Sequence, residues 1–319
     1  MQKIYIIHEN EEWTKPLKVQ LKSLGLKFEE WYLHRGQLDL SVSPPFGVFY
    51  NRMSASSHTR NHRYAAEHTA AVLSWLEGNG RRIINSSRAL QLEVSKVAQY
   101  AALNSHGIRT PRTVAVVGQE EILTAARNFD GPFITKHNRG GKGLGVRLFQ
   151  NIGELRDYVD GPEFEFPIDG ITLVQQYIAA PQPFITRCEF IGGEFFYAVR
   201  VDTSEGFLLC PADECQTNDA IGPRTPTSKF QIIKEFDHPI LERYRHFLAD
   251  NETHIAGIEF ILDKDGELYT YDINTNTNYN QTAETEAGVS GMRRIAEYLG
   301  DQLAEVAREG VDERQVNTG

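Results

Sequence analysis

Short apolar runs and amphipathic stretches alternate over the first 90 residues of the chain. The apolar runs, which predict buried strands, lie at residues 3–8, 47–52 and 81–86. The amphipathic stretches, which predict helices ending at glycine, lie at residues 14–26 and 60–80. Because strand and helix follow one another in turn, residues 1–90 predict a small doubly wound α/β domain.

The pattern changes after residue 90. Residues 86–107 predict one long helix that stops at Gly107. Most later apolar segments predict strands, at 112–117, 132–138, 145–150, 172–178, 185–201, 254–262 and 267–274. Helices are predicted between or after them at 120–129, 151–159, 241–251 and 291–309. Hairpin turns at Gly192-Gly193 and Asp265-Gly266 indicate antiparallel pairing. We expect an α+β region with subdomains 91–180 and 181–305, and assign 306–319 to a tail that frays from residue 310.

Two acids interrupt the apolar pattern of the last predicted hairpin. Glu259 and Asp272 stand in adjacent strands, and Asn274 falls on the same face as Asp272. Buried carboxylates are costly unless they are paired or bind a metal. Three oxygen ligands on one face suit a hard cation such as Mg²⁺. A hydrogen-bonded structural acid pair is the alternative, and we favour the metal.

A glycine-rich loop follows the strand that carries Lys136. It contains Gly140, Gly141, Gly143 and Gly145 together with Arg139 and Lys142. The loop is not a P-loop, since glycine follows Lys142, and it is not a dinucleotide-binding turn, since a strand follows it. Glycines let backbone N–H groups approach phosphate oxygens, so phosphate binding is favoured over a simple hairpin loop.

Two further features are ambiguous when taken alone. Lys96 stands on a predicted amphipathic helix, where a lysine is usually just solvated. Residues 172–181 form a strand end that could present backbone groups to a flat heterocycle or be an ordinary strand end.

Composition narrows the class of protein. The chain has 319 residues, 40% of them hydrophobic, with 33 basic and 43 acidic side chains and a net charge of -10. This charge argues against non-specific binding to nucleic acid or anionic lipid. We see no signal peptide and no run long enough to span a membrane. Cys188, Cys210 and Cys215 suggest neither a disulfide framework nor a zinc site, so we expect a cytoplasmic protein.

The order of these features resembles the ATP-grasp superfamily, and more narrowly the RimK-like carboxylate–amine ligases of the glutamate-ligase type, over roughly residues 50–285. The resemblance implies an ATP-grasp fold with an N-terminal pre-ATP-grasp domain. It implies that nucleotide is bound by Lys96, Lys136, Gly140, Gly141, Gly143, Gly145 and a hinge formed by Gln176, Tyr177 and Ile178. It implies catalytic roles for Arg187, Lys142 and Arg200, and Mg²⁺ ligation by Glu259, Asp272 and Asn274, with Mn²⁺ as an alternative ion.

The reaction that the resemblance implies joins a small-molecule or peptide carboxylate to an amine through an acyl phosphate, releasing ADP and phosphate. It needs no protein nucleophile, so Cys188 and the histidines are expected to be non-catalytic. His58 and His62 are interpreted as lining the substrate cleft, with a metal site as the less favoured alternative. A homodimer or homotetramer is expected. Two alternatives stay open: a non-catalytic ATP-binding sensor or scaffold, and an ATP-grasp phosphotransferase.

The chain departs from the family pattern at several positions. Ser95 precedes the first lysine where aspartate is usual, Gln175-Gln176 replaces Gln-Glu, and Glu259 stands where aspartate is more frequent. The larger departures are residues 207–216 and 275–284, which follow the Arg200 strand and Asn274. The residues expected to bind ATP and metal therefore match the family pattern better than those expected to bind the substrate. The resemblance does not specify glutamate as the substrate.

Overall fold

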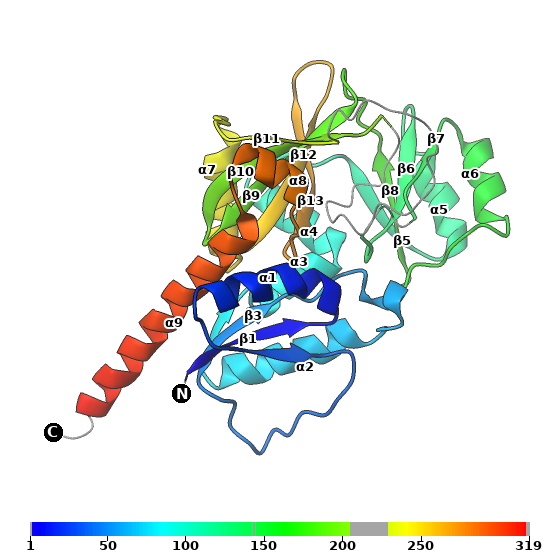
Figure 1. Cartoon of the computed structure of the whole chain (residues 1–319). Helices are drawn as coiled ribbons and strands as arrows, with labels where there is room; N and C mark the ends of the chain where they lie inside the picture. The colour runs from blue at the N-terminus through cyan, green and yellow to red at the C-terminus, as the bar shows by residue number, and fades with distance from the viewer. Residues whose placement is uncertain (1, 142, 144, 205–228, 317–319) are drawn as a thin grey trace.

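The structure is a computed structural model that describes residues 2–141, 143, 145–204 and 229–316, with side chains described as far as residue 309. Its framework is a four-stranded sheet near the N-terminus, a second four-stranded sheet and a five-stranded sheet. Figure 1 shows the N-terminal sheet below the five-stranded sheet, with the remaining sheet to one side. The predicted combination of an α/β part and an α+β part is confirmed.

The N-terminal part is a parallel sheet with strand order β2-β1-β3-β4. Its elements are β1 (Lys3–His8), α1 (Glu11–Ser23), β2 (Phe28–Tyr32), β3 (Gly47–Asn51), the 3₁₀ helix η1 (Ser57–Arg60), α2 (Ala65–Gly78) and β4 (Arg82–Ile84). Helix α1 packs on one face and α2 on the other, which gives the predicted doubly wound arrangement (Figure 1). Strand β2 was not predicted, because it is an edge strand whose Glu29 and Glu30 are exposed.

Residues 86–107 form two helices rather than the single predicted one, α3 (Ser87–Val94) and α4 (Lys96–Ser105). Ser95 between them has extended backbone angles, φ −143° and ψ 109°, and its side chain accepts a hydrogen bond from the N–H of Ala98. This N-cap gives a partner to an N–H at the start of α4, so the break is stabilised locally. Lys96 consequently lies at the first residue of a helix and not along the side of a long one.

The second four-stranded sheet is antiparallel with strand order β5-β8-β6-β7. Its elements are β5 (Thr113–Val117), α5 (Gln119–Ala126), β6 (Phe133–His137), β7 (Arg147–Phe149), α6 (Ile152–Val159) and β8 (Ile171–Gln176). Apolar side chains of α5 and α6 pack on one face of the sheet and form one core with Phe133, Phe149 and Val174. The other face is left to line a cavity.

The five-stranded sheet is also antiparallel, with order β11-β10-β9-β12-β13. Its elements are β9 (Phe184–Ile191), β10 (Glu194–Asp202), β11 (Phe230–Ile233), α7 (Ile240–Asp250), β12 (Ile255–Leu262), β13 (Leu268–Asn274) and α8 (Gln281–Ala287). Helices α4 and α7 share a core with one face of the sheet. Both hairpin turns lie where predicted, after Ile191 and after Leu262.

Helix α9 (Gly291–Val316) returns to the N-terminal part. Its Met292, Ile295 and Leu299 join the core of β1, α1 and β3, so α9 ties the last segment of the chain to the first (Figure 1). The helix continues through Val316 instead of fraying from residue 310 as predicted, because the glutamate, arginine and glutamine of this segment extend an existing helix readily. Among the described residues, no helix is both long and apolar enough to cross a membrane.

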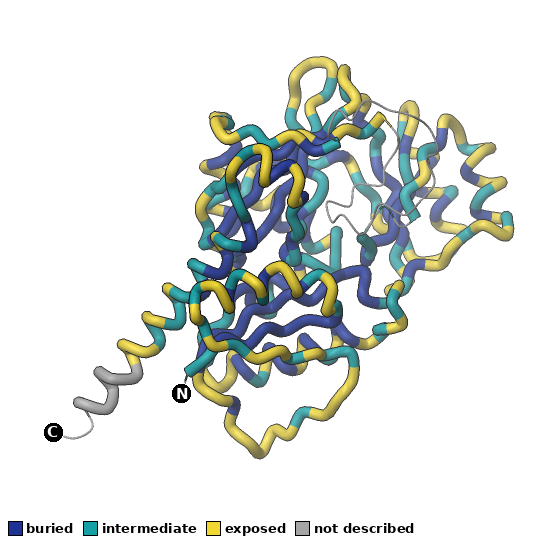
Figure 2. The backbone as a smooth tube through the Cα atoms, in the orientation of Figure 1, coloured by how far each residue is buried: buried dark blue, intermediate teal, exposed yellow. Residues whose placement is uncertain are grey.

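Figure 2 shows that β1, β3, β9 and β12 are buried over most of their length, whereas the long segment between β2 and β3 is mostly exposed. The hydrophobic cores lie within and between the sheets.

Candidate active site

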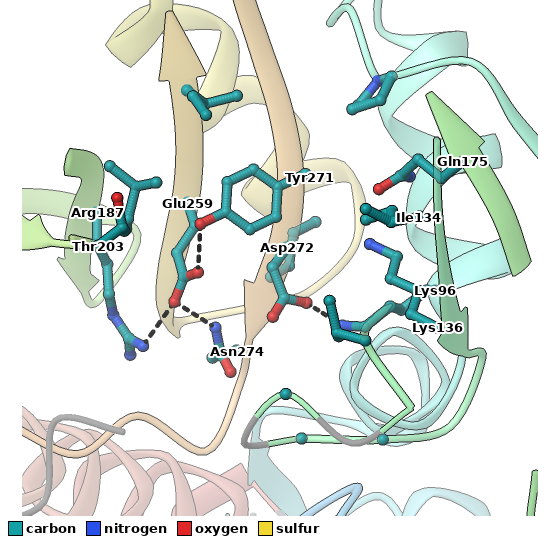
Figure 3. A pocket seen from close by; sticks show the side chains of 18 of the residues that line it. Lys96, Ile134, Lys136, Gln175, Arg187, Thr203, Glu259, Tyr271, Asp272 and Asn274 are labelled. Atoms are coloured by element: carbon teal, nitrogen blue, oxygen red, sulfur yellow. Dashed lines mark hydrogen bonds and ion pairs between the residues drawn. The ribbon is translucent and has the colours of Figure 1, made fainter. Parts of the chain in front are cut away.

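A cavity of about 620 Å³ lies between the two antiparallel sheets, and the N-terminal part closes one end of it. The structure brings together here residues that the sequence placed in five separate segments. The predicted site residues that line the cavity are Lys96, Lys136, Gly140, Gly141, Gly143, Gln176, Tyr177, Ile178, Arg187, Glu259, Asp272 and Asn274. Figure 3 shows the acids in the middle, Arg187 on one side and the lysines on the other.

Arg200 is not brought to the cavity. A regular hairpin from the Ile191–Glu194 pair would place Arg200 on the same face as Arg187, but the register shifts between Phe195 and Tyr197. Arg187 is therefore opposite Val199, and Arg200 points to the other face, where its guanidinium lies 4.3 Å from the ring centroid of Phe184. This bulge separates two arginines that chain order alone puts together.

Gly145 does not line the cavity either. Gly145 has φ +67°, and a Cβ atom there would lie 2.3 Å from Cδ2 of His137, so the position serves the close packing of the loop exit. Lys142 lies outside the described residues, as do Cys210 and Cys215.

Strands β12 and β13 pair with Glu259 opposite Asp272 and Gly257 opposite Asn274, in agreement with the predicted adjacency. Between the Glu259–Asp272 and Phe260–Thr270 pairs, Tyr271 is an extra residue that forms a β-bulge. Tyr271 and Asp272 consequently both line the cavity, and the Tyr271 hydroxyl donates a 3.0 Å hydrogen bond to Glu259 Oε2. Strict alternation would put these neighbours on opposite faces, which is why Tyr271 was missed.

The two acids differ in their electrostatic surroundings. Burial raises the pKa of Glu259, an effect that Arg187 opposes and the charge of Asp272 reinforces. Burial also disfavours the charged form of Asp272, but Lys96, which forms an ion pair with it, and Lys136 outweigh this effect and lower its pKa. The amide of Asn274 donates a 3.3 Å hydrogen bond to Glu259 Oε1. The three side chains thus form one compact oxygen-bearing group.

The lysines reach the acids from the opposite wall. Lys96 projects from the start of α4 to Asp272 (Figure 3). Lys136 on β6 is 5% exposed and donates a hydrogen bond to the hydroxyl of Tyr100. That hydroxyl donates to the carbonyl of Tyr271 at 2.8 Å, so Tyr100 connects the two walls. Burial and the charge of Lys96 lower the pKa of Lys136 to about 7.

Arg187 is held by a buried network. It donates from Nε to Glu189 Oε1 at 2.5 Å, from Nη1 to Glu259 Oε1 at 3.2 Å and from Nη2 to Thr277 Oγ1 at 2.5 Å. Gly257 makes room for it, because a Cβ atom there would lie 2.4 Å from both Nε and Nη2. The guanidinium is therefore fixed beside Glu259 before any ligand binds.

The strand end after β8 presents backbone groups to the cavity. The N–H of Gln176 donates to Arg112 O at 2.9 Å, and the N–H of Tyr177 donates to Pro132 O at 3.2 Å. Within the described part of the chain, the carbonyl of Tyr177 and the N–H of Ile178 have no hydrogen-bond partner. These two groups belong to one trans peptide unit and point in opposite directions, so only one of them can face an adenine ring.

The glycine-rich loop is held against the N-terminal part. Arg139 is buried and donates to Glu67 on α2 at 2.7 Å. A Cβ atom on Gly141 would lie 3.5 Å from Cβ of Ser56, so the backbone of the loop packs closely on the 54–56 segment. The described part of the loop thus lies over the lysine end of the cavity.

A family model described as the RimK-like ATP-grasp domain matches residues 94–299. The chain belongs to the RimK-like ATP-grasp family.

The chain is also similar to characterised proteins and solved structures. It is 26% identical over 165 residues to alpha-aminoadipate–LysW ligase LysX of Sulfurisphaera tokodaii, a match that covers 51% of this chain and 55% of that protein. The structure of ATP-grasp ligase PsnB complexed with minimal precursor superimposes with a TM-score of 0.67 at 16% identity, covering 95% of this chain and 99% of that one. The structure of the same ligase complexed with minimal precursor, Mg and ADP superimposes with a TM-score of 0.64 at 16% identity, covering 94% of this chain and 97% of that one.

The chemistry of this ATP-grasp cavity fits a nucleotide and a divalent cation. The buried Glu259 and the partly buried Asp272 lie side by side, and with the pKa of Glu259 raised they form an oxygen set that a cation would stabilise. In the described part of the chain no group of three or more His, Cys, Asp or Glu side chains could hold a metal, and the amide of Asn274 lies beside Glu259 as a further oxygen-bearing group. The paired lysines and the loop suit phosphate groups.

Several residues of the site were not predicted. Tyr100, Glu189 and Thr277 act through contacts between distant segments, and no local pattern marks them. The interpretation of His58 and His62 as cleft residues does not agree with the structure. Neither lines the cavity, and His62 Nδ1 lies 2.8 Å from Glu9 Oε2. Cys188 is buried on the opposite face of β9 from Arg187.

Proposed function

We propose that this protein is an ATP-dependent carboxylate–amine ligase that forms an amide or peptide bond through an acyl phosphate and releases ADP and phosphate. The observation that carries the proposal is the arrangement of the cavity. Two lysines, the buried Glu259, the partly buried Asp272 and a fixed arginine face one another across it.

In the proposed reaction, an oxygen of the substrate carboxylate attacks the γ-phosphorus of ATP and ADP leaves. The amine nitrogen then attacks the acyl carbon, phosphate leaves and a proton is released. Both steps depend on charge neutralisation and alignment rather than on a protein nucleophile. Lys96 and Lys136 offset phosphate charge, and Arg187 is positioned beside Glu259 to stabilise charge on the transferred group.

Glu259, Asp272 and Asn274 would hold Mg²⁺, with Mn²⁺ as an alternative ion, and the ion would supply charge neutralisation at the phosphates. Gln176, Tyr177 and Ile178 would form the hinge beside adenine, and Gly140, Gly141 and Gly143 would approach the phosphates. Lys142 is proposed to assist phosphoryl transfer. Arg200 is not included, since it faces away from the cavity.

The substrates are proposed to be a small-molecule or peptide carboxylate and an amine. The relatives agree with both classes, since LysX is named for alpha-aminoadipate and LysW, and PsnB is complexed with a precursor. We further propose a cytoplasmic homodimer or homotetramer, which light scattering of the purified protein would test.

The decisive experiment measures ADP release from ATP and Mg²⁺ with matched acids and amines, and identifies the products by mass spectrometry. A ligase releases ADP only when both an acid and an amine, or hydroxylamine as an amine substitute, are present. ATP binding without turnover for every pair would instead indicate a binding protein. A stable phosphoester product would indicate a phosphotransferase.

A further inference from the structure

The segment after β13 alternates between buried and cavity-facing side chains. Asn274, Asn276 and Asn278 line the cavity, whereas Thr275 and Thr277 are buried. The N–H of Thr275 donates to Glu93 Oε2 at 2.7 Å, and the Thr277 hydroxyl donates to Glu189 Oε2 at 2.9 Å. The threonines therefore anchor the segment, and the asparagines are presented to the cavity.

Arg52, which directly follows β3, fixes the orientation of two of these asparagines. It is 2% exposed and donates from Nε to Asn276 Oδ1 at 3.1 Å and from Nη2 to Asn278 Oδ1 at 2.9 Å. Arginine has no acceptor, so each amide must turn its oxygen toward it. The Nδ2 groups of both asparagines are left without a hydrogen-bond partner in the described part of the chain.

The charge of Arg52 is not neutralised by direct pairing. Its other contacts are the carbonyl oxygens of Trp13 and Thr277, both at 3.1 Å, and no carboxylate of the described residues forms an ion pair with it. Glu93, which also lines the cavity, is instead bound by the N–H groups of Ala55, Thr275 and Asn276. A buried cation whose contacts are all neutral polarises the two amides that it holds.

We propose that Asn276 and Asn278 bind a carboxylate of the acid substrate other than the one that reacts, and that Arg52 is a positioning residue for them. The inference rests on the proposed function. The Nδ2 groups of these two cavity-lining amides can donate to a carboxylate and cannot accept from an ammonium group, so this wall recognises the acid and not the amine. The reacting carboxylate belongs beside Arg187 and Glu259, and the second one lies at the end closed by Trp13 and Ser56.

The test compares acids that differ only at the second carboxylate. Hydroxamate formation is measured with ATP, Mg²⁺ and hydroxylamine for glutarate against glutaramate and for succinate against succinamate. We expect the diacid of each pair to give a kcat/KM at least about tenfold higher, because charge-assisted hydrogen bonds are lost in the amide. Equal values, or a preference for the amides, would overturn the proposal.

Asn276→Asp tests the Nδ2 donor of Asn276 without disturbing the fold. The new carboxylate pairs with Arg52, which keeps the segment anchored, but it removes the N–H donor and neutralises the cation. We expect the KM for the diacid to rise at least about tenfold with the KM for ATP unchanged. Asn79→Asp, which adds the same charge at an exposed position, should leave both constants unchanged. A diacid preference that survives Asn276→Asp would refute the assignment.

Binding separates this inference from the proposed function. Calorimetric titration of the protein with Mg²⁺ and ADP requires no turnover. Glutarate should bind at least about tenfold more tightly than glutaramate to the wild type, and equally to Asn276→Asp. Absence of ADP release together with this binding difference would reject the ligase and retain the carboxylate site, whereas equal or absent binding rejects the site.

Discussion

Replacement of Lys136 by methionine should stabilise the nucleotide-free protein and remove nucleotide binding. Lys136 is 5% exposed, and its pKa is lowered from an ordinary value of 10.5 to about 7 by burial and by the charge of Lys96. Because each pKa unit is equivalent to about 1.4 kcal/mol, the charged form of this side chain costs the folded state about 5 kcal/mol. Methionine has a similar length and no charge, so it removes this cost.

The sign of the pH dependence follows from the same shift. Below pH 7 the lysine is protonated in the folded and unfolded protein, and the full cost is present. Above pH 7 the folded protein loses the proton while the unfolded chain keeps it up to about pH 10.5. Between pH 7 and about pH 10.5, loss of the Lys136 proton should therefore raise the stability of the wild type by about 1.4 kcal/mol per pH unit. Lys136→Met lacks this contribution.

Urea unfolding at pH 6.5, 7.5 and 8.5 measures the effect. The advantage of Lys136→Met over the wild type should be largest at pH 6.5 and should shrink by roughly 2 kcal/mol by pH 8.5. Lys264→Met, at an exposed turn, serves as the control and should run parallel to the wild type. The reasoning is refuted if the free energy of unfolding of Lys136→Met changes with pH as that of the wild type does. It is also refuted if Lys136→Met is less stable than the wild type at pH 6.5.

Three further substitutions test other parts of the site. Asp272→Asn should abolish Mg²⁺-dependent ATP turnover while far-UV circular dichroism stays unchanged, and unchanged turnover would reject the metal assignment. Gly257→Ala should displace the guanidinium of Arg187 and lower kcat by roughly tenfold to a hundredfold, with little change in the KM for ATP. A higher KM for ATP with an unchanged kcat would count against a role for Arg187 in phosphoryl transfer. Asn85→Ala removes four buried hydrogen bonds to Ile255, Thr275 and His254 from a residue at φ 60°, so urea unfolding should show a loss of roughly 3–5 kcal/mol; a loss below 1 kcal/mol would contradict this.

Chain order and strand periodicity predict the nucleotide end of the cavity well. Lys136 and the glycines are adjacent in sequence, and a hairpin turn is enough to place Glu259 and Asp272 on adjacent strands, although the bulge sets their exact register. The errors arise where one residue changes the periodicity. The bulge at Tyr271 adds a side chain to the cavity, and the bulge near Phe196 turns Arg200 away from it. Neither bulge leaves a mark in the pattern of apolar residues, since apolar side chains occur on both faces of these strands.

The substrate end could not be predicted for a different reason, which is that it is assembled from all parts of the fold. The segment 275–278 is held by Glu93 from α3, Glu189 from β9 and Arg52 from the N-terminal sheet. Thr277 joins two of the charged groups directly, since its hydroxyl accepts from Arg187 and its carbonyl accepts from Arg52. A ligand that shifts Asn276 or Asn278 therefore acts on the same short segment that holds Arg187. Recognition of the acid and alignment of the transferring centre are consequently coupled through Thr277, without any contact between the two arginines.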